Sequence, residues 1–208
     1  MTLRDATSGL QPHLGGRPFA SAVMILTYIR DPRLRTVSEF NFCRGQNKTS
    51  PGQMCWDWKH TEEQCGKYTL LNWLKCPATS NGARNRQVRM LSVGNQTPTT
   101  DDLDRAMVTV FKQMTWFGVL DLAPLSLCLL RHYMGVVETV SWPAFKTENR
   151  TFKSSFDQLS QDEQTQLVVA NALDLALWEQ AKQVLVARAL ATGAQSCGSL
   201  ARESRPLA

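Results

Sequence analysis

The chain has 208 residues, a mass of 23.3 kDa and a formal net charge of +5. Hydrophobic residues make up 43% of it and charged residues 20%, which excludes wholesale disorder and is ordinary for one globular domain. The positive charge favours acidic partners, such as nucleotide phosphates and sulfated or carboxylated glycans. Nucleic acid is not expected as a partner, because Lys and Arg are scattered and no zinc-finger or RNP pattern occurs.

The N-terminal residues show no targeting segment. No apolar signal core follows Met1, and the apolar runs near it are far shorter than the ~20 residues of a membrane span. Taken alone, this pattern indicates a cytosolic protein. Residues 1–19 are rich in Gly, Pro and polar residues and are predicted to form a disordered lead-in.

The first ordered elements are predicted where an apolar segment runs straight into a charged one. Residues 20–29 are expected to form a buried strand, and residues 32–42 a helix. Asp31 is a preferred N-cap residue, and Pro32 suits the first helical position because its missing N–H would be unpaired there anyway.

This junction predicts an anion site. Arg30 follows the strand at its carboxyl end, where open α/β sheets bind phosphorylated ligands beside helix N-termini. Arg35 and Ser38 are three positions apart and share one face of the predicted helix. Two guanidinium groups and a hydroxyl could therefore converge on one phosphate. Solvated arginines at an ordinary strand–helix junction would explain the same pattern.

The cysteines and glycosylation sequons point away from the cytosol. Four cysteines crowd a polar, Trp-rich irregular segment, and they lack a C-x-x-C pair: Cys43, Cys55, Cys65 and Cys76. This pattern indicates two disulfides in any of three pairings rather than a zinc site, with free cytosolic thiols as the alternative. N-glycosylation sequons begin at Asn47, Asn95 and Asn149. We therefore expect a secretory-pathway lumen, with the N-terminal anchor missing from this chain.

Further elements follow from hydrophobic periodicity and capping signals. Residues 70–74 form a short helical candidate, and residues 85–91 an amphipathic piece with Val88 and Leu91 inward. The remaining predictions are a helix from Asp101 capped by Thr100, a buried strand over residues 116–121, a helix from Pro124 to Tyr133 ended by Gly135, and one long helix from about Gln161 to Leu190. His132 is expected to be a surface or packing histidine. Residues 191–208 are predicted to be a disordered tail.

A polar loop over residues 142–153 brings aromatic and cationic side chains together. Aromatic rings can stack on a purine while Lys and Thr reach phosphates or ring nitrogens. A solvated loop without a ligand is the alternative on composition alone.

Several of these segments resemble one family. Arg30-Asp31-Pro32-x-x-Arg35-x-x-Ser38-Glu39-Phe40 after an apolar strand resembles the 3′-phosphate-binding segment of sulfotransferases that use 3′-phosphoadenylyl sulfate (PAPS). The closest resemblance is to the heparan sulfate 6-O-sulfotransferases of the Golgi. The heptapeptide at residues 85–91, beyond the Cys76-Pro77 pair, resembles a signature of the same enzymes. Weaker similarities lie in residues 116–121, in the aromatic-x-x-x-Asn-x-Thr loop that ends at Thr151, and in residues 171–182.

The resemblance implies an α/β fold in which a parallel sheet is flanked by helices. Residues 20–190 would be the C-terminal half of a P-loop-type sulfotransferase domain, with the N-terminal phosphosulfate-loop portion missing. Arg30 and Ser38 would hold the 3′-phosphate of PAPS with support from Arg35, and the loop would enclose the nucleotide through Phe145, Lys146, Thr147 and Thr151. The family has Arg after that Thr, whereas Phe152 and Lys153 follow here.

The family's catalytic base cannot be assigned by this resemblance. Family members carry a Lys-Thr-Gly-type loop followed by a histidine base, and nothing similar occurs before Arg30. His13 lies in no matching context, so the catalytic residues stay unknown, and no metal is implied.

The expected function is transfer of a sulfuryl group from PAPS to a hydroxyl of a heparan sulfate-like glycosaminoglycan, with the 6-O position favoured. The full-length enzyme would be a type II membrane glycoprotein of the Golgi lumen, in contact with the membrane only through its N-terminal anchor. This chain alone is expected to be incomplete, and weakly active or inactive. The alternative is a non-catalytic glycan- or nucleotide-binding module.

Overall fold

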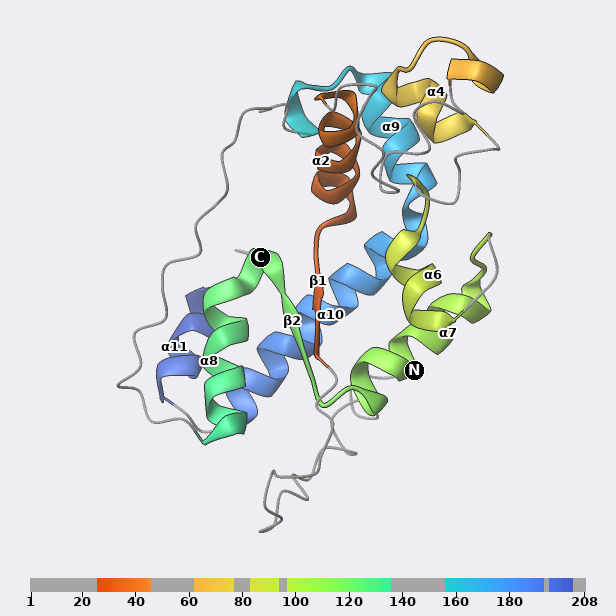
Figure 1. Ribbon diagram of the computed structural model, residues 1–208. Helices are drawn as coiled ribbons and strands as arrows, with labels where there is room; N and C mark the ends of the chain where they lie inside the picture. The colour runs from red at the N-terminus through yellow and green to blue at the C-terminus, as the bar shows by residue number, and fades with distance from the viewer. Residues whose placement is uncertain are drawn as a thin grey trace.

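The fold is mixed α/β and mostly helical, with a small parallel sheet between its helices (Figure 1). The computed structural model describes residues 26–45, 62–76, 83–93, 97–135, 156–192 and 195–203. Strand β1 (Leu26–Ile29) pairs in parallel with β2 (Trp116–Val119), in a register that sets Leu26 beside Trp116 and Ile29 beside Val119. The predicted parallel sheet flanked by helices is present in this coarse sense.

The described helices follow the expected order along the chain. They are α2 (Pro32–Gly45), α4 (Leu70–Lys75), α6 (Arg86–Ser92), α7 (Thr100–Val108), α8 (Ala123–Met134), α9 (Gln161–Ala170), α10 (Ala172–Ala191) and α11 (Gln195–Glu203). A π-helical turn, Thr109–Gln113, extends α7, and short 3-10 turns lie at Leu120–Leu122 and Phe156–Gln158. No helix in these described ranges is both long and apolar enough to cross a membrane.

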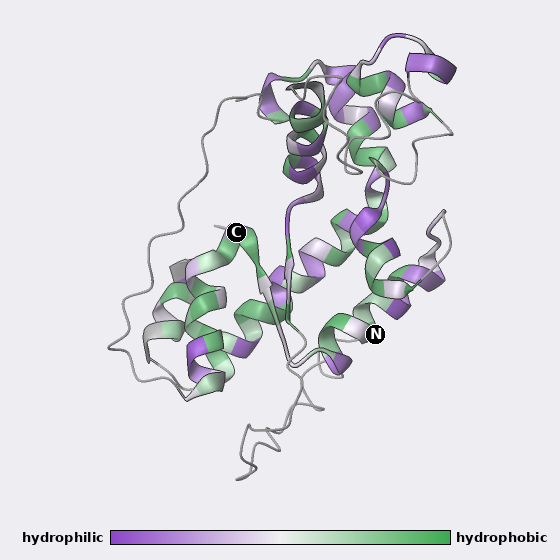
Figure 2. Cartoon of the chain, in the orientation of Figure 1, coloured by the Kyte–Doolittle hydropathy of each residue, from purple (hydrophilic) through white to green (hydrophobic). Residues whose placement is uncertain are grey.

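Two hydrophobic clusters hold these elements together. The larger one surrounds the sheet and α10, and its fully buried members include Ile29, Phe117 and Leu177. The smaller one joins α2, α4 and α9 through residues such as Phe40, Trp73 and Leu167. Hydrophobic residues dominate α8 in Figure 2, whereas the passage from β1 into α2 is strongly hydrophilic. Hydrophilic residues therefore gather where β1 ends and α2 begins.

Several helix ends confirm local signals in the sequence. Gly135 ends α8 in the left-handed conformation at φ 63°, and Pro124 lies in its first turn. The N-cap of α7 is Thr99 rather than the predicted Thr100. The Thr99 side chain accepts from the Asp102 backbone while the Asp102 carboxylate accepts from the Thr99 N–H, a complete capping box that Thr100 would not form.

The predicted long helix over residues 161–190 is wrong, because the chain breaks it at Asn171. Asn171 is fully buried with φ −120° and ψ 27°, and its side-chain amide donates to the Leu167 carbonyl at 3.1 Å. Its own side-chain oxygen accepts from Arg35 at 3.3 Å. These contacts satisfy polar groups at the break, so α9 ends there and α10 begins as a separate helix.

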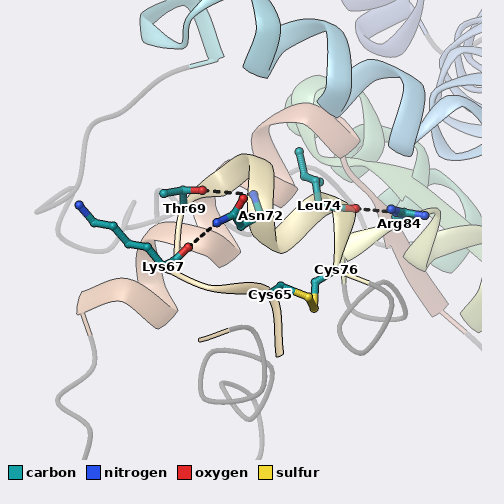
Figure 3. The surroundings of a disulfide bond; sticks show 7 residues. All are labelled: Cys65, Lys67, Thr69, Asn72, Leu74, Cys76 and Arg84. Atoms are coloured by element: carbon teal, nitrogen blue, oxygen red, sulfur yellow. Dashed lines mark hydrogen bonds between the residues drawn. A yellow bond between two sulfur atoms is a disulfide. The ribbon is translucent and has the colours of Figure 1, made fainter. Parts of the chain in front are cut away.

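The predicted disordered tail is also wrong for residues 195–203, which form α11. A disulfide between Cys128 and Cys197 joins α11 to α8, and Cys197 is only 1% exposed. A second disulfide joins Cys65 to Cys76 beside α4 (Figure 3), and Cys43 is disulfide-bonded as well. Disulfides rather than zinc or free thiols were predicted for the loop cysteines, but the sequence did not predict the Cys128–Cys197 pair.

The first strand is buried on one side only, contrary to the prediction of a buried strand. Ile29 is inaccessible, whereas Leu26 and Tyr28 are 47% and 40% exposed. The Tyr28 ring packs edge-on against Trp116 of β2 with 5.1 Å between ring centroids. Gly118 lies beside these two rings, and a Cβ atom there would meet Trp116 at 2.5 Å and Tyr28 at 2.7 Å.

Gly118→Ala is therefore expected to lower the free energy of unfolding by roughly 1–3 kcal/mol, because the added methyl must displace two packed rings. Chemical denaturation measures the change. Gly198→Ala is the matched control, since its nearest contact would be 3.8 Å from the Arg202 side chain and it lies in helix α11. Equal effects of the two substitutions would contradict the packing argument.

The C-cap of α6 is conformationally strained. Val93 follows the helix at φ 53° and ψ 34°, and it is 96% exposed. A β-branched residue in this left-handed region costs roughly 1–2 kcal/mol, and glycine avoids that cost. The strain is local because the side chain makes almost no contacts.

Val93→Gly is accordingly expected to stabilise the protein by about 0.5–1 kcal/mol after the entropy cost of glycine is subtracted. Met90→Gly provides the control within the same helix, where Met90 is 67% exposed. That change should destabilise by about 1 kcal/mol, because glycine is a poor helix former. Thermal melts that show both variants destabilised alike would argue against strain at Val93.

Candidate functional site

The N-terminus of α2 is capped by the carboxylate of Asp31. Asp31 is 5% exposed, and its carboxylate accepts from the Arg33 backbone N–H at 2.8 Å and from Arg33 Nη2 at 2.7 Å. The Asp31 N–H in turn donates to the Asp121 carboxylate at 3.1 Å. Asp31 is thus the N-cap, as predicted. An anion at this end would meet side chains rather than open N–H groups of the helix.

Arg30 is fixed through its backbone rather than through its side chain. Its N–H donates to Gln87 Oε1 at 3.0 Å, and its carbonyl accepts from Gln87 Nε2 at 2.9 Å. The Gln87 amide therefore pairs with the end of β1 as a neighbouring strand would. The half-buried Arg30 guanidinium makes no hydrogen bond or ion pair with the residues that the structure describes.

Arg35 is occupied within the fold. Its Nη1 pairs with Glu39 Oε2 at 2.7 Å, and its Nη2 donates to Thr36 Oγ1 at 2.9 Å, while the side chain is 14% exposed. Burial lowers the pKa of this guanidinium, although Glu39 and Asp174 act in the opposite direction. The positive charges of Arg86 and Arg30 lower the pKa of Arg35 further.

Glu39 connects α2 to α6. Its second carboxylate oxygen pairs with Arg86, so one carboxylate serves both Arg35 and Arg86. We call Arg30, Arg35, Arg86 and Glu39 the arginine cluster. Two of its three cations, Arg35 and Arg86, share the Glu39 carboxylate, and buried Asp174 adds a second negative charge that acts on Arg35. Arg30 is the member of the cluster whose guanidinium has no ion pair with a described carboxylate.

Two helix N-termini cap each other beside this cluster. Asn85, the N-cap of α6, accepts on Oδ1 from the N–H groups of Leu173 and Asp174 at 3.0 and 3.2 Å. The Asp174 carboxylate in turn accepts from the N–H groups of Gln87 and Val88 at 3.0 and 2.8 Å. Burial raises the pKa of Asp174, and these backbone hydrogen bonds oppose the rise. The reciprocal cap fixes Gln87, and thereby Arg30.

The predicted site residues are only partly covered by the structure. Arg30 directly follows β1, Arg35 lies in α2, and the exposed Ser38 lies on α2 directly before Glu39. The predicted nucleotide loop lies outside the described residues, with Phe145, Lys146, Thr147 and Thr151, as do the three sequon asparagines. His132 is exposed at the surface as expected.

Arg86 and Gln87 were not predicted to belong to the site. The amphipathic pattern of residues 85–91 placed Arg86 on a solvated face, whereas it pairs with Glu39 and is 32% exposed. The resemblance singled out this segment, but no spacing rule links it to a residue 47 positions earlier in the chain. The charged pair Arg35–Glu39 at i and i+4 was the only local signal.

Comparisons with known proteins add no family assignment. No protein-family model matches the chain, and a search of curated proteins found no significant match. Among the described residues, no group of three or more His, Cys, Asp or Glu side chains is placed to hold a metal ion.

The reciprocal cap can be tested without disturbing the backbone. Asn85 adopts φ 41° and ψ 41°, which glycine accepts readily, so Asn85→Gly removes the capping oxygen alone. Two N–H groups of α10 then lose their acceptor, and we expect a loss of about 1–3 kcal/mol in unfolding free energy. Denaturant titration measures it. An unchanged midpoint would show that the cap contributes nothing.

Proposed function

We propose that the arginine cluster binds the 3′-phosphate of a nucleotide, and that the chain is part of a PAPS-dependent carbohydrate sulfotransferase of the heparan sulfate 6-O type. The supporting observation is the placement of Arg30 at the carboxyl end of a parallel strand with its guanidinium uncommitted to described residues. Ligands of open α/β sheets bind at this edge.

The proposal gives different tasks to Ser38 and to the members of the arginine cluster. Arg30 and Ser38 supply a guanidinium and an exposed hydroxyl for the phosphate, and each charge-assisted hydrogen bond contributes about 1.5–3 kcal/mol net. Arg35 acts as a positioning residue, because Glu39, Thr36 and Asn171 already occupy its two Nη groups. Its buried charge nevertheless adds to the attraction of an anion.

The remaining parts of the proposal rest on the sequence resemblance. The loop with Phe145, Lys146, Thr147 and Thr151 would enclose the nucleotide, and a heparan sulfate-like polysaccharide would be the acceptor. The disulfides support an oxidising lumen, in keeping with a Golgi enzyme that is membrane-anchored in its full-length form. Sulfuryl transfer also requires cations at the leaving group and a base for the hydroxyl proton. Because neither is assigned here, we expect weak or no transfer by this chain alone.

Titration calorimetry with adenosine 3′,5′-bisphosphate tests the phosphate site, with adenosine 5′-monophosphate as the ligand that lacks the 3′-phosphate. We expect the bisphosphate to bind more tightly to the unaltered chain. Arg30→Ala should weaken bisphosphate binding about 10-fold or more and remove the preference over the monophosphate, because one charge-assisted contact is lost.

Lys112→Ala is the matched control, since it removes one exposed positive charge from the π-helical turn after α7. It should leave both affinities unchanged. Bisphosphate binding that survives Arg30→Ala would refute the phosphate site. Salt-dependent binding of heparin without any nucleotide binding would instead favour the non-catalytic glycan-binding module.

A further inference from the structure

A cavity of about 290 Å³ lies apart from the arginine cluster, between α4, α9 and the segments that precede α6 and α7. Its apolar lining comes from Leu74, Pro98, Val169 and Ala170. Arg84, Asn85, Thr97 and Gln166 complete the lining with polar groups. Arg84 is the single charged member of this set.

Arg84 is anchored in a way that leaves its terminal nitrogens available. Its Nε donates to the carbonyl of Leu74 at 2.7 Å, near the C-terminal end of α4 (Figure 3). In the part of the chain that the structure describes, neither Nη group of Arg84 has a hydrogen-bond partner or an ion pair. An anchored guanidinium with two parallel free donors fits the two oxygens of a carboxylate end-on.

We propose that this cavity binds a small organic carboxylate with an apolar body. The carboxylate pairs with Arg84, and the apolar body packs against Leu74, Pro98 and Val169. The volume lies near the lower end of ligand pockets, which restricts the occupant to a compact molecule. Among the residues that the structure describes, the lining contains no carboxylate to compete for Arg84. This inference does not rest on the proposed nucleotide site.

The charge requirement can be separated from the shape requirement with two probes of nearly equal size. Benzoate carries the carboxylate, and benzamide is its neutral isostere. We expect benzoate to produce saturable shifts of the backbone amide NMR signals of Val169 and Ala170, with benzamide binding at least about 10-fold more weakly, because only the carboxylate forms charge-assisted hydrogen bonds.

Two variants test the charged and the apolar parts of the cavity lining. Arg84→Gln removes the charge, and Val169→Trp fills the cavity from a position that is 65% exposed while the chain keeps Arg84. Each variant should weaken benzoate binding by about 10-fold or more. Arg84→Gln loses the charge-assisted contact, and Val169→Trp occupies the volume that benzoate needs. Val168→Trp is the control, because Val168 is the neighbouring exposed residue of α9 and does not line the cavity.

Benzoate binding that survives Val169→Trp would overturn the proposal, as would equal affinity for benzamide or a complete absence of saturable shifts. Should Arg84→Gln unfold the chain by releasing the end of α4, Val169→Trp and the benzamide comparison still decide the outcome. Binding of adenosine 3′,5′-bisphosphate should be unchanged in Val169→Trp. The carboxylate proposal and the nucleotide proposal can therefore be refuted independently of each other.

Discussion

The reciprocal cap between Asn85 and Asp174 is the interaction on which the rest of the structure depends. Each of these side chains accepts two backbone N–H groups from the first turn of the other's helix. Unpaired N–H groups buried at a helix end would each cost about 1–3 kcal/mol, so the pair allows the N-termini of α6 and α10 to meet in the interior. Gln87 is held by this cap, and its amide in turn binds the backbone of Arg30, the residue directly after β1.

Electrostatics at the junction follow from the same arrangement. Arg35 is removed from water, a costly state for a guanidinium, and the carboxylates of Glu39 and Asp174 offset that cost. Glu39 is therefore committed to two arginines of different helices, and it cannot also neutralise Arg30 in full. Among the described residues, Arg30 is therefore left outside the ion pairs that Glu39 makes with Arg35 and Arg86. The contacts of Glu39 within the fold, rather than a ligand, hold the positively charged Arg35 and Arg86 near each other.

Local signals in the sequence predicted the elements but not their long-range contacts. The start of α2 at Asp31, the strand at residues 116–119 and the end of α8 at Gly135 depend on neighbouring residues and were predicted. The break at Asn171 was missed because its partner, Arg35, lies 136 positions away. For the site, Arg30 and Arg35 were found from spacing, whereas Arg86 required knowledge of the fold. Helix α11 was missed because a Gly- and Ser-rich composition conceals its link to Cys128.

The disulfide between Cys128 and Cys197 has a consequence for α10. It closes a loop with a sequence separation of 69, and such a closure lowers the entropy of the unfolded chain by an amount equivalent to about 4 kcal/mol. Helix α10 lies inside this loop, and Asp174 anchors its opposite end. The disulfide fixes α11, the helix that follows α10, and buried hydrogen bonds of Asp174 fix the first turn of α10. The two restraints together oppose movement of α10 along its own axis.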